Sequence, residues 1–500
     1  MNRQRRQFLR TTMGMGSLVV LGRHVSAIGS MPQSIEALAL DGSVRSLPAA
    51  SLAGLAAELQ GALLLPQSAG YDPARRLFFS ERFDRRPAFI VQPTGPSDVG
   101  LAVDFARENG LLLAVKGGGH SDLGVSSHEQ AMMLDLGVLR GVRVDPGARR
   151  AWVAGATPAG LIDHETGAHR LAVPLGGDPT VCVGGLALGG GIGKLGRAYG
   201  LTLDSVRSID LVCADGQLRR VSAHENADLF WGLRGGGGNF GVATAFELDV
   251  HPVPPQVLAG TIRFPFHQLR QVAAGYGELA RNAPDPLYVE LFIQVRDTVE
   301  ASIVQLHVCH SGDQADAERA IRPFRRLGDV QHDDVAPVSY PAAQNSGAHS
   351  AARAPAKAPR DTFFRSAFLD ELGAPLASVL ADSLTPDPAR SVVMLFLHAG
   401  GAIARHPVQA TAFSHRSAMH DMIFVATAPV GQKLPAEAAQ VWARFHPFTR
   451  GFYVNEMGGG VSPSEVAANY GANAPRLAAL KRRWDPHNLF RLNANILPAA

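Results

Sequence analysis

Four glycine-rich segments and one histidine carry the residue types that point to chemistry in this sequence. The segments span residues 117–121, 176–181, 184–193 and 234–241, and His120 ends the first glycine run. Glycine permits positive φ angles and lets backbone N–H groups approach phosphate oxygens closely. Four such segments between residues 117 and 241 indicate a long, flat, phosphorylated cofactor better than they indicate a single phosphate group.

One of these segments also matches a nicotinamide-dinucleotide motif. Residues 191–196 read Gly-x-Gly-x-x-Gly, and Asp215 supplies an acidic residue farther along. That motif normally follows a hydrophobic strand and opens a helix within a βαβ unit. Here further glycines precede it and the rest of the unit is missing, so we do not favour this interpretation.

Composition indicates an ordinary globular enzyme-sized chain. The 500 residues are 46% hydrophobic and 18% charged, and the 53 glycines are the outlier. No run of lysine and arginine interleaved with aromatics occurs, which argues against nucleic acid as a partner. The three cysteines are too few and too scattered for a disulfide framework. His307, Cys309 and His310 lack further ligands at zinc spacing, so we predict no metal site.

The first 27 residues are typical of an export signal. Arg5 and Arg6 precede Phe8 and Leu9, a short apolar stretch follows, and residues 25–27 read Val-Ser-Ala. This order resembles a twin-arginine signal, so we expect the twin-arginine translocase as a partner and a periplasmic or extracellular location. Five of the 47 basic residues lie in this segment, so without it the 44 acidic residues outnumber the basic ones. We expect no membrane-spanning helix elsewhere.

Alternating and periodic apolar residues predict the elements that position the glycine segments. A strand at 88–91, a helix from 97 to about 109 and a strand at 111–116 lead into Gly117. Further strands are predicted at 132–136, 151–155 and 208–214. From about residue 255 the pattern predicts strands at 258–264, 288–295, 302–308, 392–397 and 422–426, with helices between them, and a last helix at 474–484.

The order and spacing of these motifs resemble one family throughout most of the chain. The motifs are Pro93-Thr94-x-x-x-Asp98-Val99, Val115 to Ser121, Asp178 to Gly185, Gly189 to Gly193, Asp228 to Gly241, Gly400-Gly401-Ala402-Ile403, Ala412-Phe413-x-His415-Arg416, Tyr453-x-Asn455, Asp485-Pro486-x-Asn488-Leu489-Phe490-Arg491 and Asn493-x-Asn495. Together they resemble the berberine-bridge-enzyme-like flavoproteins, which have the vanillyl-alcohol-oxidase type of FAD-binding fold.

The resemblance implies FAD as cofactor, bonded through His120 to the 8α carbon of the flavin. A neutral imidazole nitrogen can form this bond, and the bond would make the flavin a stronger hydride acceptor. The cofactor-binding residues implied are Gly117, Gly118, Gly119, His120, Ser121, Asp178, Thr180, Val181, Gly184, Gly185, Gly189, Gly190, Gly193, Arg234, Gly235, Gly236, Gly237, Phe240, Gly241, Asn493 and Asn495.

A second covalent bond, found in many members, is not expected here. Those members have a cysteine where this chain has Asp178. Cys182 lies four residues later and is a weak candidate for a replacement. We therefore predict a single covalent bond through His120, with Val181 close to an oxygen path toward the flavin.

Four residues are candidates for catalysis. The resemblance makes Tyr453 the base or an orienting hydroxyl, and on a strand Asn455 would share its face while Glu456 would not. Glu290 lies on a predicted strand beside Tyr288 and Phe292, where it lines a substrate cleft or faces solvent. His398 ends an apolar strand and is either a site residue or a structural core histidine.

The predicted fold is α+β, with a two-part FAD-binding domain and a substrate domain whose antiparallel sheet is backed by helices. We expect the signal at 1–27, the FAD-binding domain at 28–254, the substrate domain at 255–455 and a C-terminal return to the FAD domain at 456–500. The expected activity is oxidation of a small organic substrate, with oxygen reoxidising the flavin. The alternatives are a dehydrogenase with another acceptor, or a flavin-binding protein without turnover, which the departures at Asp178 and Ala494 leave open.

Overall fold

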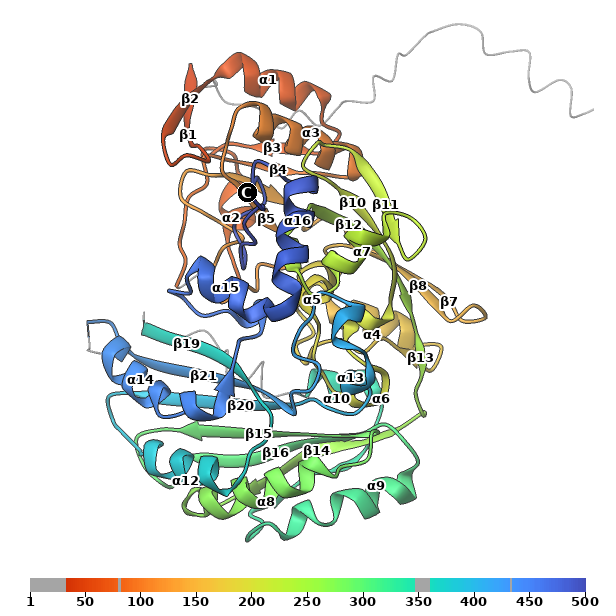
Figure 1. Cartoon of the computed structure of the whole chain (residues 1–500), viewed down its shortest axis with the longest axis vertical. Coiled ribbons are helices and arrows are strands. Elements are labelled where there is room, and N and C mark those ends of the chain that lie inside the picture. The colour runs from red at the N-terminus through yellow and green to blue at the C-terminus, as the bar shows by residue number, and fades with distance from the viewer. Residues whose placement is uncertain (1–32, 80–81, 347–359, 432–433) are drawn as a thin grey trace, which may run out of the picture.

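The chain forms two parts that lie one above the other in Figure 1. The computed structural model describes residues 33–79, 82–346, 360–431 and 434–500. The upper part holds the N-terminal elements together with the last two helices, and the lower part holds one large sheet. The predicted export signal lies outside the described residues. No helix among those described is long and apolar enough to cross a bilayer.

A four-stranded sheet carries the first glycine segment. Its strand order is β3-β4-β6-β5, and β4, β6 and β5 run parallel. The strands and the helix that packs on them are β3 (Ala62–Leu64), β4 (Phe89–Gln92), β5 (Leu113–Lys116), β6 (Met132–Asp135) and α3 (Pro96–Glu108). Val99, Val103 and Ala106 recur at helical spacing on α3 and are fully buried, so this stripe holds the helix in place. Gly117 follows directly at the end of β5.

A second, antiparallel sheet carries the other glycine segments. Its strand order is β11-β10-β12-β8-β7. The strands are β7 (Val142–Asp145), β8 (Arg150–Ala154), β10 (Val206–Val212), β11 (Leu218–Ser222) and β12 (Val242–Asp249). Helix α5 (Val183–Gly189) lies between β8 and β10 in sequence, and α7 (Ala227–Leu233) precedes the glycine loop that leads into β12.

The lower part is a nine-stranded antiparallel sheet covered by helices on one face (Figure 1). Its strands are β14 (Val257–Phe264), β15 (Leu287–Val295), β16 (Ile303–His310), β17 (His332–Asp333), β18 (Ala336–Val338), β19 (Arg360–Leu369), β20 (Ser391–His398), β21 (His420–Pro429) and β22 (Thr449–Arg450). The covering helices are α8 (Leu269–Arg281), α9 (Gln314–Ile321), α12 (Ala374–Ser383) and α14 (Leu434–Ala443). Val289, Leu291 and Ile293 of β15 join the core under the helices, which leaves the alternate residues for the other face.

These elements confirm the predicted α+β class with its antiparallel sheet backed by helices. Each predicted strand is present with its ends shifted by a few residues at most, and the helix at 474–484 is α16 (Ala474–Trp484). Tyr453 and Asn455 do not lie on a strand, the geometry from which their shared face was argued, because residues 454–456 form a 3₁₀ turn, η8 (Val454–Glu456).

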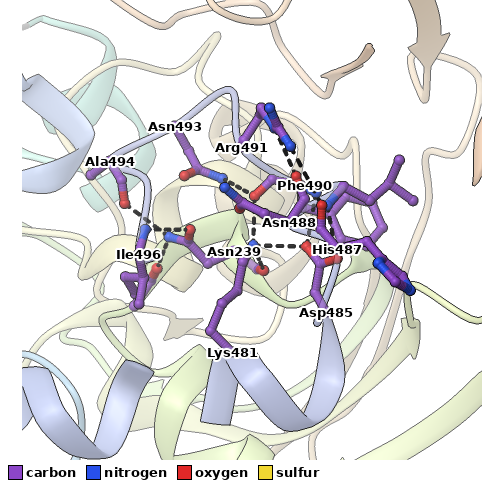
Figure 2. Close-up of polar contacts among 12 residues, drawn as sticks. Asn239, Lys481, Asp485, His487, Asn488, Phe490, Arg491, Asn493, Ala494 and Ile496 are labelled. Carbon is purple, nitrogen blue, oxygen red and sulfur yellow. Dashed lines mark hydrogen bonds and ion pairs between the residues drawn. The ribbon is translucent and has the colours of Figure 1, made fainter. Parts of the chain in front are cut away.

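A buried lysine attaches the C-terminal segment, residues 485–496, to the upper part (Figure 2). The Lys481 ammonium has no exposed surface and donates to Asp485 Oδ2 (2.7 Å), Asn239 O (2.7 Å) and Phe490 O (2.8 Å). Asp485 in turn accepts the backbone N–H groups of Leu489 and Phe490. All three ammonium hydrogens are therefore used, as a buried charge requires.

Asn239 makes the second attachment of the C-terminal segment. Its amide nitrogen donates to Gly236 O (2.8 Å) and Ala494 O (3.0 Å), and its Oδ1 accepts from Ile496 N (2.9 Å). One fully buried side chain thus connects the glycine loop to the end of the chain, as Figure 2 shows.

Replacement of the buried ammonium tests this arrangement. Lys481→Met should lower the free energy of unfolding by about 3–5 kcal/mol, because it leaves the Asp485 carboxylate buried without its cation. Urea unfolding followed by circular dichroism measures the change.

Arg482→Met is the matched control on the next residue of α16. Arg482 is exposed and donates to Ala499 O, so its loss should change stability by less than about 0.5 kcal/mol. Equal stability of the two variants would contradict the role given to Lys481.

Candidate functional site

A cavity lies between the glycine segments and the face of the lower sheet that points away from α8, α9, α12 and α14. Its volume is about 320 Å³. The upper wall comes from the loops after β5, after β9 (Leu171–Ala172) and after α7, together with the C-terminal segment. Tyr288 and Glu290 of β15 and Leu397 of β20 supply the lower wall.

Most of the predicted cofactor-binding residues line this cavity. They are Gly117, Gly118, Gly119, His120, Ser121, Asp178, Val181, Gly184, Gly185, Gly193, Gly236, Gly237, Gly241 and Asn493. A Cβ built on Gly185 or on Gly237 meets no heavy atom within 4 Å, so at these positions the backbone faces open space. Gly237 also has a φ of +68°, which favours glycine.

His120 is held on the cavity wall by a ring contact and a hydrogen bond. Its imidazole stacks on Phe78 with ring centroids 4.2 Å apart and planes 23° apart. Its Nε2 lies 3.0 Å from Thr180 Oγ1. The Thr180 hydroxyl donates to Asp178 Oδ1 over 2.6 Å, and the same oxygen accepts Thr180 N over 2.9 Å. Asp178, His120 and Thr180 therefore form one connected group.

Cys182 also lines the cavity, next to the glycine run that precedes His120. A Cβ on Gly118 would meet its Sγ at 2.9 Å. The thiol donates to Ala156 O over 3.1 Å, and burial raises its pKa to about 11. The sulfur is therefore protonated at neutral pH and a poor nucleophile.

Tyr453 and Asn455 meet at the cavity as predicted, although on a turn. The Tyr453 hydroxyl accepts Gly191 N (2.6 Å) and Asn455 Nδ2 (2.8 Å). Burial raises the pKa of Tyr453 far above its usual value of about 10, so the phenol keeps its proton at neutral pH. The geometry therefore makes Tyr453 an orienting hydrogen-bond donor and not a base.

Glu456 lines the same cavity, which corrects the prediction that it points away from Tyr453. The 3₁₀ turn winds residues 453–457 so that all of them reach the cavity, whereas a strand would alternate them. Near Glu456 lies Asp421 of β21, which is completely buried. Burial raises the pKa of Asp421 and its contact with Glu456 lowers it, the first effect being larger.

Glu290 faces the cavity and not the solvent. It is 3% exposed, its Oε2 accepts the Tyr288 hydroxyl (2.7 Å), and its Oε1 lies 3.0 Å from His307 Nδ1. Gln305 Nε2 lies 2.7 Å from His307 Nε2, which leaves the ring hydrogen on Nδ1 and makes it the donor to Glu290. The two donors hold a carboxylate at the wall of the cavity.

His398 is the structural core histidine of its two predicted alternatives, which corrects its inclusion among the candidates for catalysis. Its Nδ1 accepts Val289 N (3.3 Å), its Nε2 bonds to Ala280 O of α8 (3.1 Å), and it has no exposed surface. Successive residues of a strand point to opposite faces, so Leu397 reaches the cavity while His398 lies under α8. Burial also lowers its pKa well below the usual value.

Seven predicted cofactor-binding residues are not among those that line the cavity. They are Thr180, Gly189, Gly190, Arg234, Gly235, Phe240 and Asn495. Gly189 and Gly190 make room for the site side chains, since a Cβ there would lie 2.0 Å from Asn455 Oδ1 and 2.9 Å from Tyr453 Cε2.

The other members of this group have structural contacts of their own. A Cβ on Gly235 would lie 2.3 Å from Phe413 N. The Arg234 guanidinium stacks over the Phe230 ring at 4.1 Å, and Phe240 lies in the apolar core. Thr180 acts through its bond to His120.

Sequence reasoning missed several residues that line the cavity, among them Lys194, Asn239, Phe490 and Leu492. Lys194 lies inside the Gly191–Gly196 motif that we set aside, and Phe490 lies in the C-terminal motif. Both motifs are visible in the sequence. The structure is needed to show that the C-terminal motif forms part of the cavity wall.

The residues fit a flavin dinucleotide on structural grounds. The cavity is lined by backbone with open space at Gly185 and Gly237, which suits phosphate contacts. Asn493 Oδ1 and Asn495 Oδ1 are buried with no hydrogen-bond partner among the described residues. Within the described ranges no three His, Cys, Asp or Glu side chains gather as a metal-binding group.

Comparisons with known proteins agree with this fit. The model of an FAD-binding domain matches residues 87–222, and the model described as berberine and berberine like matches residues 453–497. (R)-6-hydroxynicotine oxidase of Paenarthrobacter nicotinovorans is 31% identical over 456 residues, which are 88% of this chain and 97% of that one.

Solved structures give the same result. A 6-hydroxy-D-nicotine oxidase structure from Arthrobacter nicotinovorans is similar with a TM-score of 0.80 and 30% identity, covering 88% of this chain and 99% of that one. Glucooligosaccharide oxidase from Acremonium strictum, described with a 6-S-cysteinyl, 8α-N1-histidyl FAD, has a TM-score of 0.79 and 24% identity over 90% of this chain and 99% of that one, a likeness of fold. The chain belongs to the berberine-bridge-enzyme-like family and is an FAD-dependent oxidoreductase.

A matched pair of glycine variants tests the cofactor wall. Gly237 (φ +68°) and Gly42 (φ +85°) both have open space at the Cβ position, but only Gly237 lines the cavity. Alanine at either position costs about 1–2 kcal/mol of backbone strain. Gly237→Ala should in addition reduce the FAD content of the purified protein, measured as flavin absorbance per chain.

Gly42→Ala should leave the FAD content at the wild-type level. Equal FAD content in both variants, at equal stability, would remove Gly237 from the cofactor wall.

Proposed function

We propose that this protein is an exported oxidase that binds FAD through a single covalent bond at His120 and oxidises a small organic substrate with oxygen. The observation that carries the proposal is the cavity itself, where His120 and the glycine backbone on one wall face Glu290 and Tyr288 on the other. FAD when bound supplies a hydride acceptor.

The proposed attachment at His120 rests on a comparison with Asp178 and Cys182, neither of which offers a nucleophile for FAD. Asp178 stands where many family members have a second attachment cysteine and offers no nucleophile of that kind. The Cys182 thiol is directed to Ala156 O, and its raised pKa keeps it protonated.

Two groups that line the cavity can handle the substrate proton. Glu290 is held as a carboxylate by Tyr288 and His307 and accepts a proton from a substrate hydroxyl or amine. Tyr453 accepts two N–H groups and keeps its own proton, so it donates to the substrate heteroatom and orients it. Asn455 fixes the phenol in this position.

The proposed substrate class is wider than the substrate of any one relative. One relative is named (R)-6-hydroxynicotine oxidase and another xylooligosaccharide oxidase. Alcohols, hemiacetals and amines all present a C–H beside a heteroatom proton, which is the pattern that Glu290 and Tyr453 would serve. Export would follow the twin-arginine route, because the N-terminal residues carry its sequence pattern and that route takes proteins already loaded with cofactor.

Acid denaturation followed by mass spectrometry tests the single bond. The wild-type chain should carry the mass of one FAD, and His120→Ala should lose it while still binding FAD without a covalent bond. Cys182→Ser is the control and should keep the FAD mass. Retention of that mass in His120→Ala would refute the attachment and would direct attention to Cys182.

Stopped-flow spectroscopy in the absence and presence of air tests the oxidase activity. At least one alcohol, hemiacetal or amine of a panel should bleach the flavin, and air should restore it rapidly with formation of hydrogen peroxide. Glu290→Gln should slow bleaching about a hundredfold or more, and leave reoxidation unchanged.

The rival activities give different results in the same instrument. Rapid bleaching with slow reoxidation in air indicates a dehydrogenase that uses another acceptor. No bleaching by any member of the panel indicates a flavin-binding protein without turnover.

A further inference from the structure

Asp178, Thr180 and His120 form a hydrogen-bond chain whose directions can be assigned. Thr180 Oγ1 lies 2.6 Å from Asp178 Oδ1 and 3.0 Å from His120 Nε2. Asp178 Oδ1 also accepts the backbone N–H of Thr180 at 2.9 Å. Asp178 is buried, with 6% of its surface exposed, whereas His120 is half-buried and Thr180 is exposed.

A hydroxyl group has one hydrogen, and here the carboxylate takes it. An ionised carboxylate only accepts hydrogen bonds, so Thr180 must donate to Asp178. Toward His120 the same hydroxyl oxygen can then only accept. His120 Nε2 must therefore carry a hydrogen, and in the neutral ring the lone pair lies on Nδ1.

We propose that Asp178, acting through the Thr180 hydroxyl, is a positioning residue that holds His120 as the Nε2–H tautomer and so makes Nδ1 the nitrogen that bonds to FAD. The proposal rests on the covalent attachment at His120 proposed above. Asp178 stands where many family members have the second attachment cysteine. The proposal gives Asp178 a role in forming the bond between His120 and FAD.

The bond-forming step balances with the groups named. The 8α-methyl carbon of the flavin loses one proton and gains a bond from His120 Nδ1. FAD would retain the two electrons of the broken C–H bond, and dioxygen would take them together with the released methyl proton and one proton from water, giving hydrogen peroxide. The Nε2 hydrogen is not transferred, so its bond to Thr180 persists.

The product gives a second reason for a carboxylate at position 178. An imidazole that carries carbon on Nδ1 and hydrogen on Nε2 is positively charged. Asp178 lies one hydroxyl group away and stabilises this charge, since opposite charges attract strongly in a buried setting. Stacking on Phe78 keeps the ring plane fixed while the bond forms.

Four variants separate the acceptor role from the charge. Thr180→Val removes the hydroxyl at nearly constant shape, and Thr180→Ser restores it. Asp178→Ala frees the Thr180 hydroxyl to donate to Nε2, which reverses the tautomer. Asp178→Asn keeps an oxygen that accepts from Thr180 but removes the charge.

The measurement is the rate of covalent FAD incorporation on incubation of the purified protein with excess FAD in air. Acid-denaturing mass spectrometry gives the covalent fraction, and filtration gives total bound FAD. Thr180→Val and Asp178→Ala should lose about tenfold or more in rate at unchanged total binding. Thr180→Ser should stay close to wild type, and Asp178→Asn should lie between. Nuclear magnetic resonance of the flavin peptide should show the bond at Nδ1.

Each result decides the proposal. Wild-type rates in both Thr180→Val and Asp178→Ala, or a bond at Nε2 in the wild type, would overturn it. If Thr180→Val also loses total FAD binding, the proposal is tested by comparing Asp178→Asn with Asp178→Ala. Equal rates of covalent FAD incorporation in these two variants would overturn the proposal as well. Absence of covalent FAD from the wild type is a different outcome, because it refutes the attachment at His120 itself.

Discussion

The Lys481 ammonium, buried between three acceptors, is the interaction on which the site depends. It joins Asp485 and Phe490 of the C-terminal segment to Asn239 of the glycine loop. A buried charge of this kind is costly unless every hydrogen has an acceptor, and here each one has. The last residues of the chain are thereby fixed against a loop encoded some 240 positions earlier. Phe490, Leu492 and Asn493 of this segment form part of the cavity wall.

The two parts of the molecule supply different walls of the cavity. The upper part contributes the backbone of its glycine segments together with side chains such as His120, Asp178 and Cys182. The lower sheet contributes polar side chains from the face that points away from α8, α9, α12 and α14, with Glu290 and Tyr288 on β15. Positive φ angles and close backbone approach explain the first surface, and strand alternation explains the second. Cofactor binding and substrate chemistry can therefore vary separately in such a fold.

Sequence alone predicted most of the elements, because buried strands and helices repeat their apolar residues with fixed periods. It also predicted the glycine segments of the cavity wall, because glycine lets backbone N–H groups approach a ligand closely and clustered glycines are visible in the sequence. It failed where one residue decides which face is presented: Leu397 reaches the cavity and His398 does not. It also failed at Tyr453, since a 3₁₀ turn and a short strand have similar local sequences. Gly189 and Gly190 serve the side chains of Asn455 and Tyr453, a tertiary contact that no local pattern encodes.

A crystal structure of the purified protein is the most direct test of the central claim, that the glycine loops, His120 and the C-terminal segment together form one FAD site. The account predicts density for one FAD in the cavity, continuous with the His120 ring, with its phosphates at the glycine backbone and Asn493 in contact. Density that is continuous with Cys182, or an FAD that does not touch the C-terminal segment, would contradict it.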